Sequence, residues 1–158
     1  YSSSINPVRH DHYGLPDAPL VPFRPAGTGL VEIPMTVVDA AGHRWHVSGG
    51  GWFRLMPYPL FRAATRRVAE GARRRPVFYF HPWEVDPGQP RVDVPARARF
   101  RHYVNLGAME GKLARLLQDF GWARIDQVFA AELSNAQGLE EWAPADAMTL
   151  ALAGQDGD

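Results

Sequence analysis

The stretch Val77-Phe78-Tyr79-Phe80-His81-Pro82-Trp83-Glu84 decides how this chain is interpreted. Its first four residues are apolar and favour β structure, and they form a run too short for a helix and too uninterrupted for a half-exposed strand. They predict a fully buried, parallel strand over 77–80. His81 follows this strand directly, and Pro82 biases His81 toward an extended backbone. Because α/β folds carry their chemistry at the carboxyl ends of strands, His81 is a candidate catalytic residue. A histidine that only satisfies hydrogen bonds at a strand end is the alternative.

The rest of the chain predicts strands and helices around that central strand. Strands are expected over 30–38, 44–47 and 122–125, and helices over 58–72, 109–120 and 127–135. A turn at 40–42 would join the first two strands as a hairpin, and the proline-rich residues 1–29 and 82–98 are expected to be loops. This order of elements predicts an α/β fold.

Apolar periodicity assigns a buried face to each of the two longer helices. In the first helix, Leu60, Ala64 and Val68 recur at helical spacing beside Phe61. In the second helix, the apolar stripe consists of Met109, Leu113, Leu116, Leu117 and Phe120. Both stripes are expected to lie in the core.

The composition bounds the class of protein. The 158 residues are 46% hydrophobic, which is enough for one domain with a core. No apolar run approaches the roughly 20 residues that span a bilayer. Acidic and basic residues balance at 17 each, which argues against nucleic-acid binding, and the absence of cysteine excludes disulfides and thiolate metal sites. Because the chain starts at Tyr1 rather than Met, a segment of a longer protein is expected.

Two further motifs invite a ligand-binding interpretation. Arg9-His10-Asp11-His12 could present two imidazoles to a metal, but a polar surface loop explains it as well and is preferred. Ser48-Gly49-Gly50-Gly51 lacks the Gly-Lys-Ser/Thr ending of a phosphate loop. Its three glycines instead predict a close approach of the backbone to a ligand or to another strand, with Trp52 and Arg54 facing the site or packing beside it.

One family accounts for these motifs and for others in the same order along the chain. The matching motifs are Ser3-Ser4-Ile5, Arg9-His10-Asp11, Pro16-Asp17-Ala18-Pro19, Glu32-Ile33-Pro34, Gly49-Gly50-Gly51, Phe53-Arg54-Leu55, the run from His81 to Arg91, and Arg99-Phe100-Arg101-His102-Tyr103. Together they resemble the C-terminal part of polysaccharide deacetylases encoded in bacterial exopolysaccharide loci, members of the NodB-like superfamily. The resemblance implies the C-terminal portion of a distorted (β/α) barrel, with the catalytic-domain region over 1–137. Residues 138–158 are expected to form an acidic, flexible tail, because five acidic residues and no basic residue follow Leu139.

The resemblance also implies an activity, the hydrolysis of the N-acetyl group of N-acetylhexosamine units in a polysaccharide. In this superfamily a divalent metal, expected to be zinc, is held by one Asp and two His and polarises the acetamide, and a later His protonates the departing amine. His81 matches that later His. The metal-binding motifs are expected upstream, in the other half of the same barrel. This segment is therefore expected to bind no metal and to be inactive alone. The protein is expected to be bacterial, and the sequence does not choose between the cytoplasm and the periplasm.

Other residues are candidates for roles beside His81. A carboxylate next to the imidazole would favour its protonated form, and the candidates for that carboxylate are Glu84, Asp86 and Glu32. The candidate substrate-binding residues are Trp52, Arg54, Trp83, Glu84 and Arg101, because tryptophans stack on sugar rings and charged side chains bind hydroxyl or carboxylate groups of a poly- or oligosaccharide.

Two alternatives to an enzyme remain open at this point. One is a carbohydrate-binding module whose stacking platforms are Trp52, Trp83, Tyr58 and Tyr103. The other is a scaffold that stabilises the upstream half of the barrel.

Overall fold

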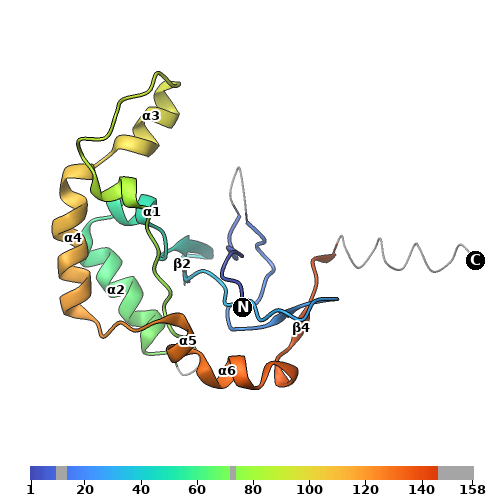
Figure 1. The fold of residues 1–158 in the computed structure, drawn as a ribbon. Coiled ribbons are helices and arrows are strands. Elements are labelled where there is room, and N and C mark those ends of the chain that lie inside the picture. The colour runs from blue at the N-terminus through green and yellow to red at the C-terminus, as the bar shows by residue number, and fades with distance from the viewer. Residues whose placement is uncertain (10–13, 72–73, 146–158) are drawn as a thin grey trace, which may run out of the picture.

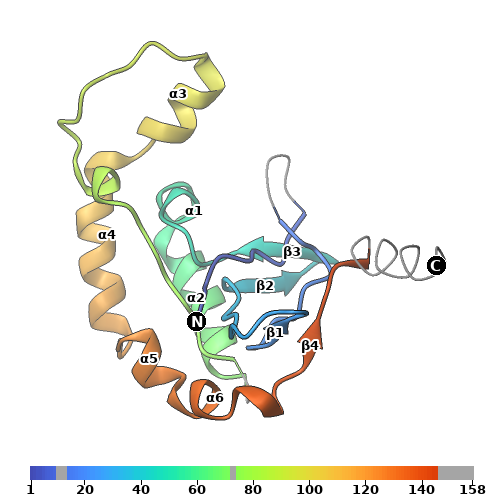
Figure 2. The ribbon, with the colours of Figure 1, turned by 45° about the vertical axis from the view of Figure 1, so that its right-hand side comes forward.

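The structure is a computed structural model that describes residues 1–9, 14–71 and 74–145 (Figure 1). Its elements, in chain order, are β1 (Arg24–Pro25), β2 (Val37–Ala40), β3 (His43–His46), α1 (Gly50–Leu55), α2 (Tyr58–Ala69), the 3-10 turn η1 (Pro82–Val85), α3 (Ala96–Tyr103), α4 (Leu106–Asp119), α5 (Ile125–Val128), α6 (Ala130–Ser134), the 3-10 turn η2 (Ala136–Gly138) and β4 (Glu141–Trp142). In Figures 1 and 2, α4, α5 and α6 form an arc along one side of the molecule, and α3 stands apart at one end.

The hairpin predicted around residues 40–42 is confirmed. β2 pairs with β3 in antiparallel register, from Val37 opposite His46 to Ala40 opposite His43. Ala41 and Gly42 both have positive φ, at 51° and 73°. Consecutive positive φ angles belong to the tight turns that match the twist of a two-stranded hairpin, which is why a small residue and a glycine stand here.

A second, two-stranded sheet joins distant parts of the chain. β1 pairs in parallel with β4, so that Arg24 lies opposite Glu141. The Arg24 guanidinium also forms an ion pair with the Glu141 carboxylate at 3.1 Å. The segment expected as a tail after residue 137 is thus attached to the fold as far as β4, while the expected domain boundary itself stays a prediction and residues 146–158 lie outside the described part.

The main core lies between α2, α4 and the start of the hairpin. Its buried members are Val38, Val47, Phe53, Phe61, Val68, Met109 and Leu116. Phe53 is fully buried and meets the rings of Phe61 and Phe78 edge to face, with centroids 4.6 and 5.1 Å apart. Edge-to-face contacts are a favoured arrangement of aromatic rings. This core holds α1 and the 77–80 segment together, and both lead into the candidate site.

The two longer helices lie where the sequence predicts them, but their buried faces are partly different. Leu60 is 62% exposed and Leu117 is 56% exposed, so the expectation that both lie in the core was wrong. In α2 the buried face is formed by Phe61, Thr65 and Val68. Apolar periodicity misses this face because Thr65 is polar. Leu60, the residue before Phe61, instead completes a competing apolar stripe.

The central strand over 77–80 was predicted to be fully buried, and that prediction was wrong. Val77 is buried, whereas Phe80 is 40% exposed. The segment is extended, but its only β-contact with described residues is an isolated parallel bridge between Tyr79 and Gly49. The ladder stops there because α1 begins at Gly50.

Other local expectations were also wrong. Within the strand expected over 30–38, only Val37 and Val38 belong to a strand, β2, and earlier Glu32 makes isolated bridges with Ser2 and Phe23. Residues 122–125 form no strand, and the helix expected over 127–135 divides into α5 and α6 around Phe129. The expected loop 82–98 contains η1 and the start of α3, since Pro82 suits the first turn of η1 and Pro95 forms the N-cap of α3.

The fold is therefore mixed α/β, as predicted. In the described part of the chain its sheets have two strands each, and the barrel that the resemblance implies stays a prediction. Within the described ranges there is also no helix with the length and apolar character that crossing a membrane requires.

Replacing neighbouring leucines tests the assigned face of α4. Leu116→Ala is expected to lower the free energy of unfolding by about 2–5 kcal/mol, because truncating a fully buried side chain leaves a cavity. Leu117→Ala should change it by less than about 0.5 kcal/mol, because that side chain is exposed. Urea unfolding of both variants provides the measurement. Equal losses would mean that α4 packs with a different face.

Tyr58 and Asp119 clamp α2 to α4 through a hydrogen bond of 2.5 Å in which the phenol donates. This bond, with Arg62 nearby, holds the pKa of Asp119 below its usual range, and burial with the same bond raises the pKa of Tyr58 to about 12. The stabilisation should be present above the ordinary carboxyl pKa and be lost as pH falls through the lowered value. It should also be present below the ordinary phenol pKa and be lost as pH rises toward 12.

Tyr58→Phe should accordingly destabilise the protein near neutral pH and have a smaller effect in acid. Tyr1→Phe is the control, because Tyr1 is 59% exposed. Urea unfolding of both variants across the acid range provides the measurement. A loss for Tyr58→Phe that does not change with pH would contradict the role of Asp119.

Candidate functional site

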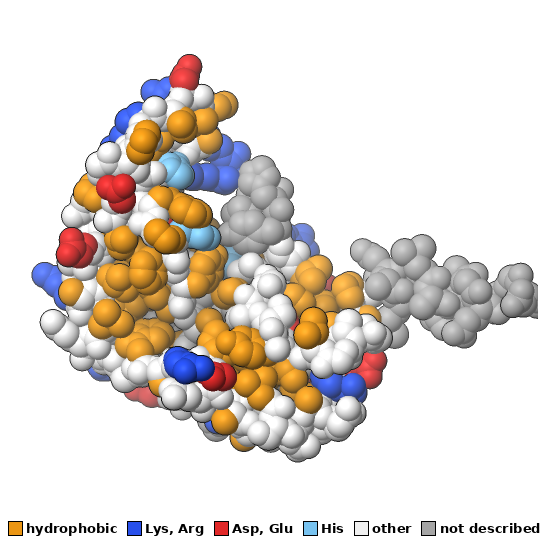
Figure 3. Space-filling view, viewed as in Figure 1, with side chains coloured by type: hydrophobic (Ala, Val, Ile, Leu, Met, Phe, Trp, Pro, Cys, Tyr) orange, Lys and Arg blue, Asp and Glu red, His pale blue; other side chains and the backbone are white. Residues whose placement is uncertain are grey.

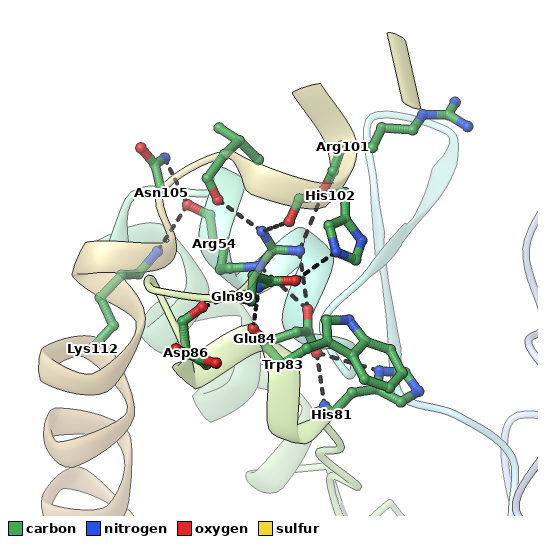
Figure 4. Close-up of polar contacts among 11 residues, drawn as sticks. Arg54, His81, Trp83, Glu84, Asp86, Gln89, Arg101, His102, Asn105 and Lys112 are labelled. Carbon is green, nitrogen blue, oxygen red and sulfur yellow. Dashed lines mark hydrogen bonds and ion pairs between the residues drawn. The ribbon is translucent and has the colours of Figure 1, made fainter. Parts of the chain in front are cut away.

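His81 lies where the extended segment meets η1. Its backbone is extended, with φ −107° and ψ 152°, and it forms the N-cap of the 3-10 turn that Pro82 begins. The expectation that Pro82 holds His81 in this conformation is confirmed. The imidazole is 48% exposed and stacks on the Trp83 indole, with centroids 4.1 Å apart and planes 14° apart. The two rings present an aromatic surface beside a titratable nitrogen (Figure 4).

Glu84 is the carboxylate that lies behind His81. Its Oε2 accepts a hydrogen bond from the His81 backbone N–H at 2.9 Å and lies 3.4 Å from Nδ1 of the same residue. The Glu84 side chain is only 4% exposed. Because Nδ1 faces this carboxylate, Nε2 is the ring nitrogen on the side away from Glu84, where it can serve a ligand.

Asp86 and Glu32, the other two candidates for this carboxylate, have different partners. Asp86 accepts a hydrogen bond from Gly88 N at 2.9 Å. Glu32 is 2% exposed and accepts hydrogen bonds from the backbone N–H groups of Ser4 and Ile5, both at 2.7 Å. Glu32 therefore fastens the N-terminal segment to the fold.

Arg54 neutralises Glu84 in the interior. Its Nε and Nη2 each lie 3.2 Å from Glu84 Oε1, and both side chains are 4% exposed. The remaining donors of Arg54 bind backbone carbonyls, with Nη1 reaching those of His102 and Val104 at 2.8 Å and Nη2 reaching that of Arg101 at 3.3 Å. The guanidinium is thus fully used within the protein. Its predicted role as a substrate ligand is not tested, but the structure gives it a supporting position.

Two further side chains close the end of α1, which carries Arg54. Lys112 donates to the carbonyls of Phe53 and, at 2.7 Å, Met56, and burial lowers the pKa of its ammonium. Asn105 donates to the Arg54 carbonyl at 3.0 Å. Carbonyls at the end of a helix lack intrahelical partners, so these donors from α4 and its N-cap satisfy α1 and fix Arg54.

Hydrogen bonds of polar side chains fix the segment between η1 and α3. Gln89 donates through Nε2 to the Trp83 carbonyl at 2.6 Å and accepts at Oε1 from His102 Nε2 at 2.7 Å. Since an amide oxygen only accepts, His102 must carry its proton on Nε2. Tyr103 accepts from Val92 N at 3.0 Å and donates to the Pro90 carbonyl at 3.2 Å. These contacts hold α3 above η1.

The structure brings most of the predicted site residues together. Figure 4 shows Arg54, His81, Trp83 and Glu84 together, whereas the Arg101 side chain points away and only its carbonyl reaches Arg54. Trp52 lies apart from this group, since its ring stacks on His46 with centroids 6.2 Å apart and it lines a separate cavity of about 180 Å³.

Gln89, His102, Asn105 and Lys112 are site residues that the sequence did not reveal as such. Gln89 and His102 fall within the motifs that suggested the family, and that was the only available signal. Asn105, with Leu106, continues the last of these motifs, which ends at Tyr103, whereas no sequence pattern pointed to Lys112.

No three His, Asp or Glu side chains lie close enough to hold a metal ion among residues 1–9, 14–71 and 74–145. The described donor set therefore does not fit a metal centre. The interpretation of His10 and His12 as metal ligands falls on residues outside the described part.

A mixed α/β domain with a buried Arg–Glu pair behind a surface histidine is the class of structure that these observations define. In a comparison with known protein families, residues 3–130 match the sequence profile described as "Domain of unknown function (DUF3473)". The chain belongs to this family. A search of curated proteins found no match, and a search of solved structures found none.

Gly50 and Gly51 offer a test of the Glu84 position. A Cβ at Gly50 would lie 2.6 Å from the Glu84 carboxyl carbon, whereas a Cβ at Gly51 would meet nothing within 4 Å. Gly50→Ala is expected to displace the carboxylate and to destabilise the protein by about 1–3 kcal/mol. It should also shift the NMR signals of the His81 ring, because that ring faces the Glu84 carboxylate.

Gly51→Ala is the matched control and should leave both the stability and the NMR signals of the His81 ring near those of the parent. If the two alanine variants behave alike, the close approach of Gly50 to Glu84 is refuted.

Proposed function

We propose that this chain is part of a polysaccharide N-deacetylase in bacterial exopolysaccharide biosynthesis, a hydrolase of the acetamide C–N bond of N-acetylhexosamine units. The observation that carries the proposal is the pairing of an exposed imidazole, His81, with a buried carboxylate, Glu84. The family has no described function, so the proposal rests on the resemblance of the motifs and on this geometry.

His81 has the surroundings that a proton donor needs. The Glu84 carboxylate faces Nδ1 at 3.4 Å, so Nε2 is the ring nitrogen that would pass a proton to the substrate. The charge of Glu84 is in turn held by Arg54, whose donors have no freedom to reorient. Hydrolysis adds the oxygen of a water to the acetamide carbonyl carbon and breaks the C–N bond. The sugar nitrogen then takes the proton from His81, and the products are acetate and the free amine.

Trp83 gives this site a surface for a sugar. The side chain is 44% exposed although it is large and apolar, and its indole lies against the His81 ring. The apolar face of a pyranose that stacks on such a surface would be held within reach of His81.

The divalent metal that the resemblance implies, expected to be zinc, would have its ligands upstream of this chain. Because the described residues contain no fitting donor set, none of the steps above passes through it. On this proposal the segment alone is inactive.

The upstream half of the same barrel would complete the fold. One feature supports that part of the proposal: Phe80, at the end of the extended segment 77–80, is 40% exposed although it is large and apolar. An exposed apolar side chain of this size can be covered by a further part of the same protein.

A carbohydrate-binding module is the rival function, and the exposed Trp83 favours it too. Two of its other platforms have partners in the protein, since Tyr58 donates to Asp119 and Tyr103 donates to Pro90. The rival therefore depends mainly on Trp83.

The decisive test is His81→Gln in the full-length protein, with acetate release from N-acetylglucosamine oligomers as the measurement. The kcat should fall by about 10²–10⁴-fold with little change in KM, because a proton donor acts on the transition state rather than on binding.

His43→Gln is the control, because His43 is an exposed histidine of the β2–β3 turn. It should leave kcat unchanged. A parent protein that releases no acetate, or a His81→Gln variant that keeps full kcat, would refute the proposal. Loss of affinity on Trp83→Ala with kcat unchanged for His81→Gln would favour the binding module.

A further inference from the structure

The indole of Trp83 forms the exposed part of the aromatic surface at the His81 site. It is 44% exposed and stacks on the His81 ring, with the two planes 14° apart. No residue of α3, a helix that is described throughout, is buried, so the helix above this surface adds no core contact. In Figure 3 histidine side chains lie at the surface between α3 and the body of the molecule, next to hydrophobic side chains. The region therefore depends on hydrogen bonds for its position.

Gln89 supplies hydrogen bonds of this kind. Its Nε2 donates to the carbonyls of Trp83 at 2.6 Å and Asp86 at 3.1 Å, and its Oε1 accepts from His102 Nε2 at 2.7 Å. Because carbonyl oxygens only accept, the amide has one possible orientation, with its nitrogen toward η1 and its oxygen toward His102. Both donors and the acceptor of Gln89 are thus used to bridge η1 and α3.

The bridge through Gln89 closes a ring of contacts behind the site. Arg54 binds the side chain of Glu84 in η1 at 3.2 Å and the carbonyl of His102 in α3 at 2.8 Å. The imidazole of His102 binds Gln89, and Gln89 returns to the backbone of Trp83, the residue before Glu84. η1 is therefore held at two points, the Glu84 side chain and the Trp83 carbonyl (Figure 4).

These two attachments act on different parts of the site. Glu84 accepts from the His81 backbone N–H at 2.9 Å and faces Nδ1 of the same residue at 3.4 Å. Gln89 instead binds the carbonyl of Trp83, whose indole offers the surface for a sugar. Loss of the Gln89 side chain should disturb that surface and leave the imidazole oriented by Glu84.

We propose that Gln89 is a positioning residue of this site, which holds Trp83 in the orientation that binds a sugar ring, and that His102 fixes the amide of Gln89. The inference rests on the proposed function and assigns two residues that control substrate binding rather than proton transfer. A binding surface is most effective when hydrogen bonds behind it fix the side chains that meet the ligand. Neither residue needs to contact the substrate.

The first test uses the full-length protein and an N-acetylglucosamine tetramer, with acetate release and calorimetric titration as measurements. Gln89→Leu should raise KM and Kd by about 3–10-fold, the range expected for loss of one aromatic contact, and should change kcat by less than about twofold. Gln89→Glu keeps an acceptor for His102 and loses both donors, so it should act in the same way. Gln118→Leu is the matched control, because Gln118 is exposed on α4.

A double substitution tests whether Gln89 acts through Trp83. Trp83→Ala should weaken binding of the tetramer, and adding Gln89→Leu should then raise Kd by less than about twofold, because the stacking surface is already lost. If the two losses multiply, Gln89 acts on binding by another route and the positioning role is refuted. An unchanged Kd for Gln89→Leu alone would refute it as well.

His102→Gln and His102→Leu test the other end of the bridge. The first variant keeps an N–H donor for the Gln89 oxygen, whereas the second does not. His102→Gln should bind the tetramer within about twofold of the parent, and His102→Leu should weaken binding as Gln89→Leu does. Equal affinities of the two variants would contradict the role of His102. This pair also decides the proposal if Gln89→Leu does not fold, since it loosens the bridge without removing Gln89.

NMR of the His81 ring provides a measurement that needs neither catalysis nor a ligand. A ring stacked on an indole has shifted proton signals, so Gln89→Leu should move the His81 signals toward those of Trp83→Ala. Urea unfolding measures the stability of the same variants. A Gln89→Leu protein that is less stable but keeps the parent's His81 signals and Kd would show a purely structural role and overturn the proposal.

Two outcomes separate the positioning role from the deacetylase activity. Tetramer binding that depends on Gln89 and Trp83, without acetate release, would sustain the positioning role while the deacetylase proposal fails. Acetate release with a KM that Gln89→Leu does not change would do the reverse. A parent protein that does not bind the tetramer also overturns the positioning role.

Discussion

The buried ion pair between Arg54 and Glu84 is the interaction on which the candidate site depends. Two charges taken out of water carry a desolvation cost of several kcal/mol each, and their mutual attraction offsets it only when hydrogen bonds satisfy the remaining polar atoms. Here every donor of Arg54 has a protein partner, and the free carboxylate oxygen of Glu84 binds His81 N. Removing one partner of such a pair leaves an uncompensated charge and costs about 3–5 kcal/mol. The pair therefore holds α1, η1 and the end of α3 in one arrangement.

This requirement explains the local sequence around both charges. Glu84 reaches Arg54 only because the backbone at Gly50 carries no side chain, since a Cβ there would lie 2.7 Å from Glu84 Oε1. The close approach expected for the three glycines is thus real, but the group that approaches is a carboxylate of the protein itself. The same glycine also begins α1, which carries Arg54 only four residues later.

The sequence allowed the helices and the hairpin to be predicted, because their signals are local. Apolar spacing located α2 and α4, and a turn signal located Ala41 and Gly42. It also drew attention to His81, Trp83 and Glu84, which do lie together. It could not reveal that Arg54 is buried, because an arginine is usually exposed and its four partners come from residues about 30 to 50 positions away. The exposure of Phe80 likewise depends on which strands lie beside it, and no periodicity within 77–80 carries that information.

The balanced net charge hides an uneven distribution that bears on function. Arg24, Arg54 and Arg75 each have a carboxylate partner from a distant part of the chain, namely Glu141, Glu84 and Glu132, so their charges hold the fold together. The arginines of α3 follow one another at alternate positions with one nearby acid, Asp93, in the sequence from 91 to 103. Like charges on one helix face repel, so this spacing needs partners elsewhere in the protein. Arg99 pairs with Asp93, and Arg97 and Arg101 have partners within the protein as well. These charges therefore help to fix α3, whose Arg101 and His102 carbonyls bind Arg54 behind His81.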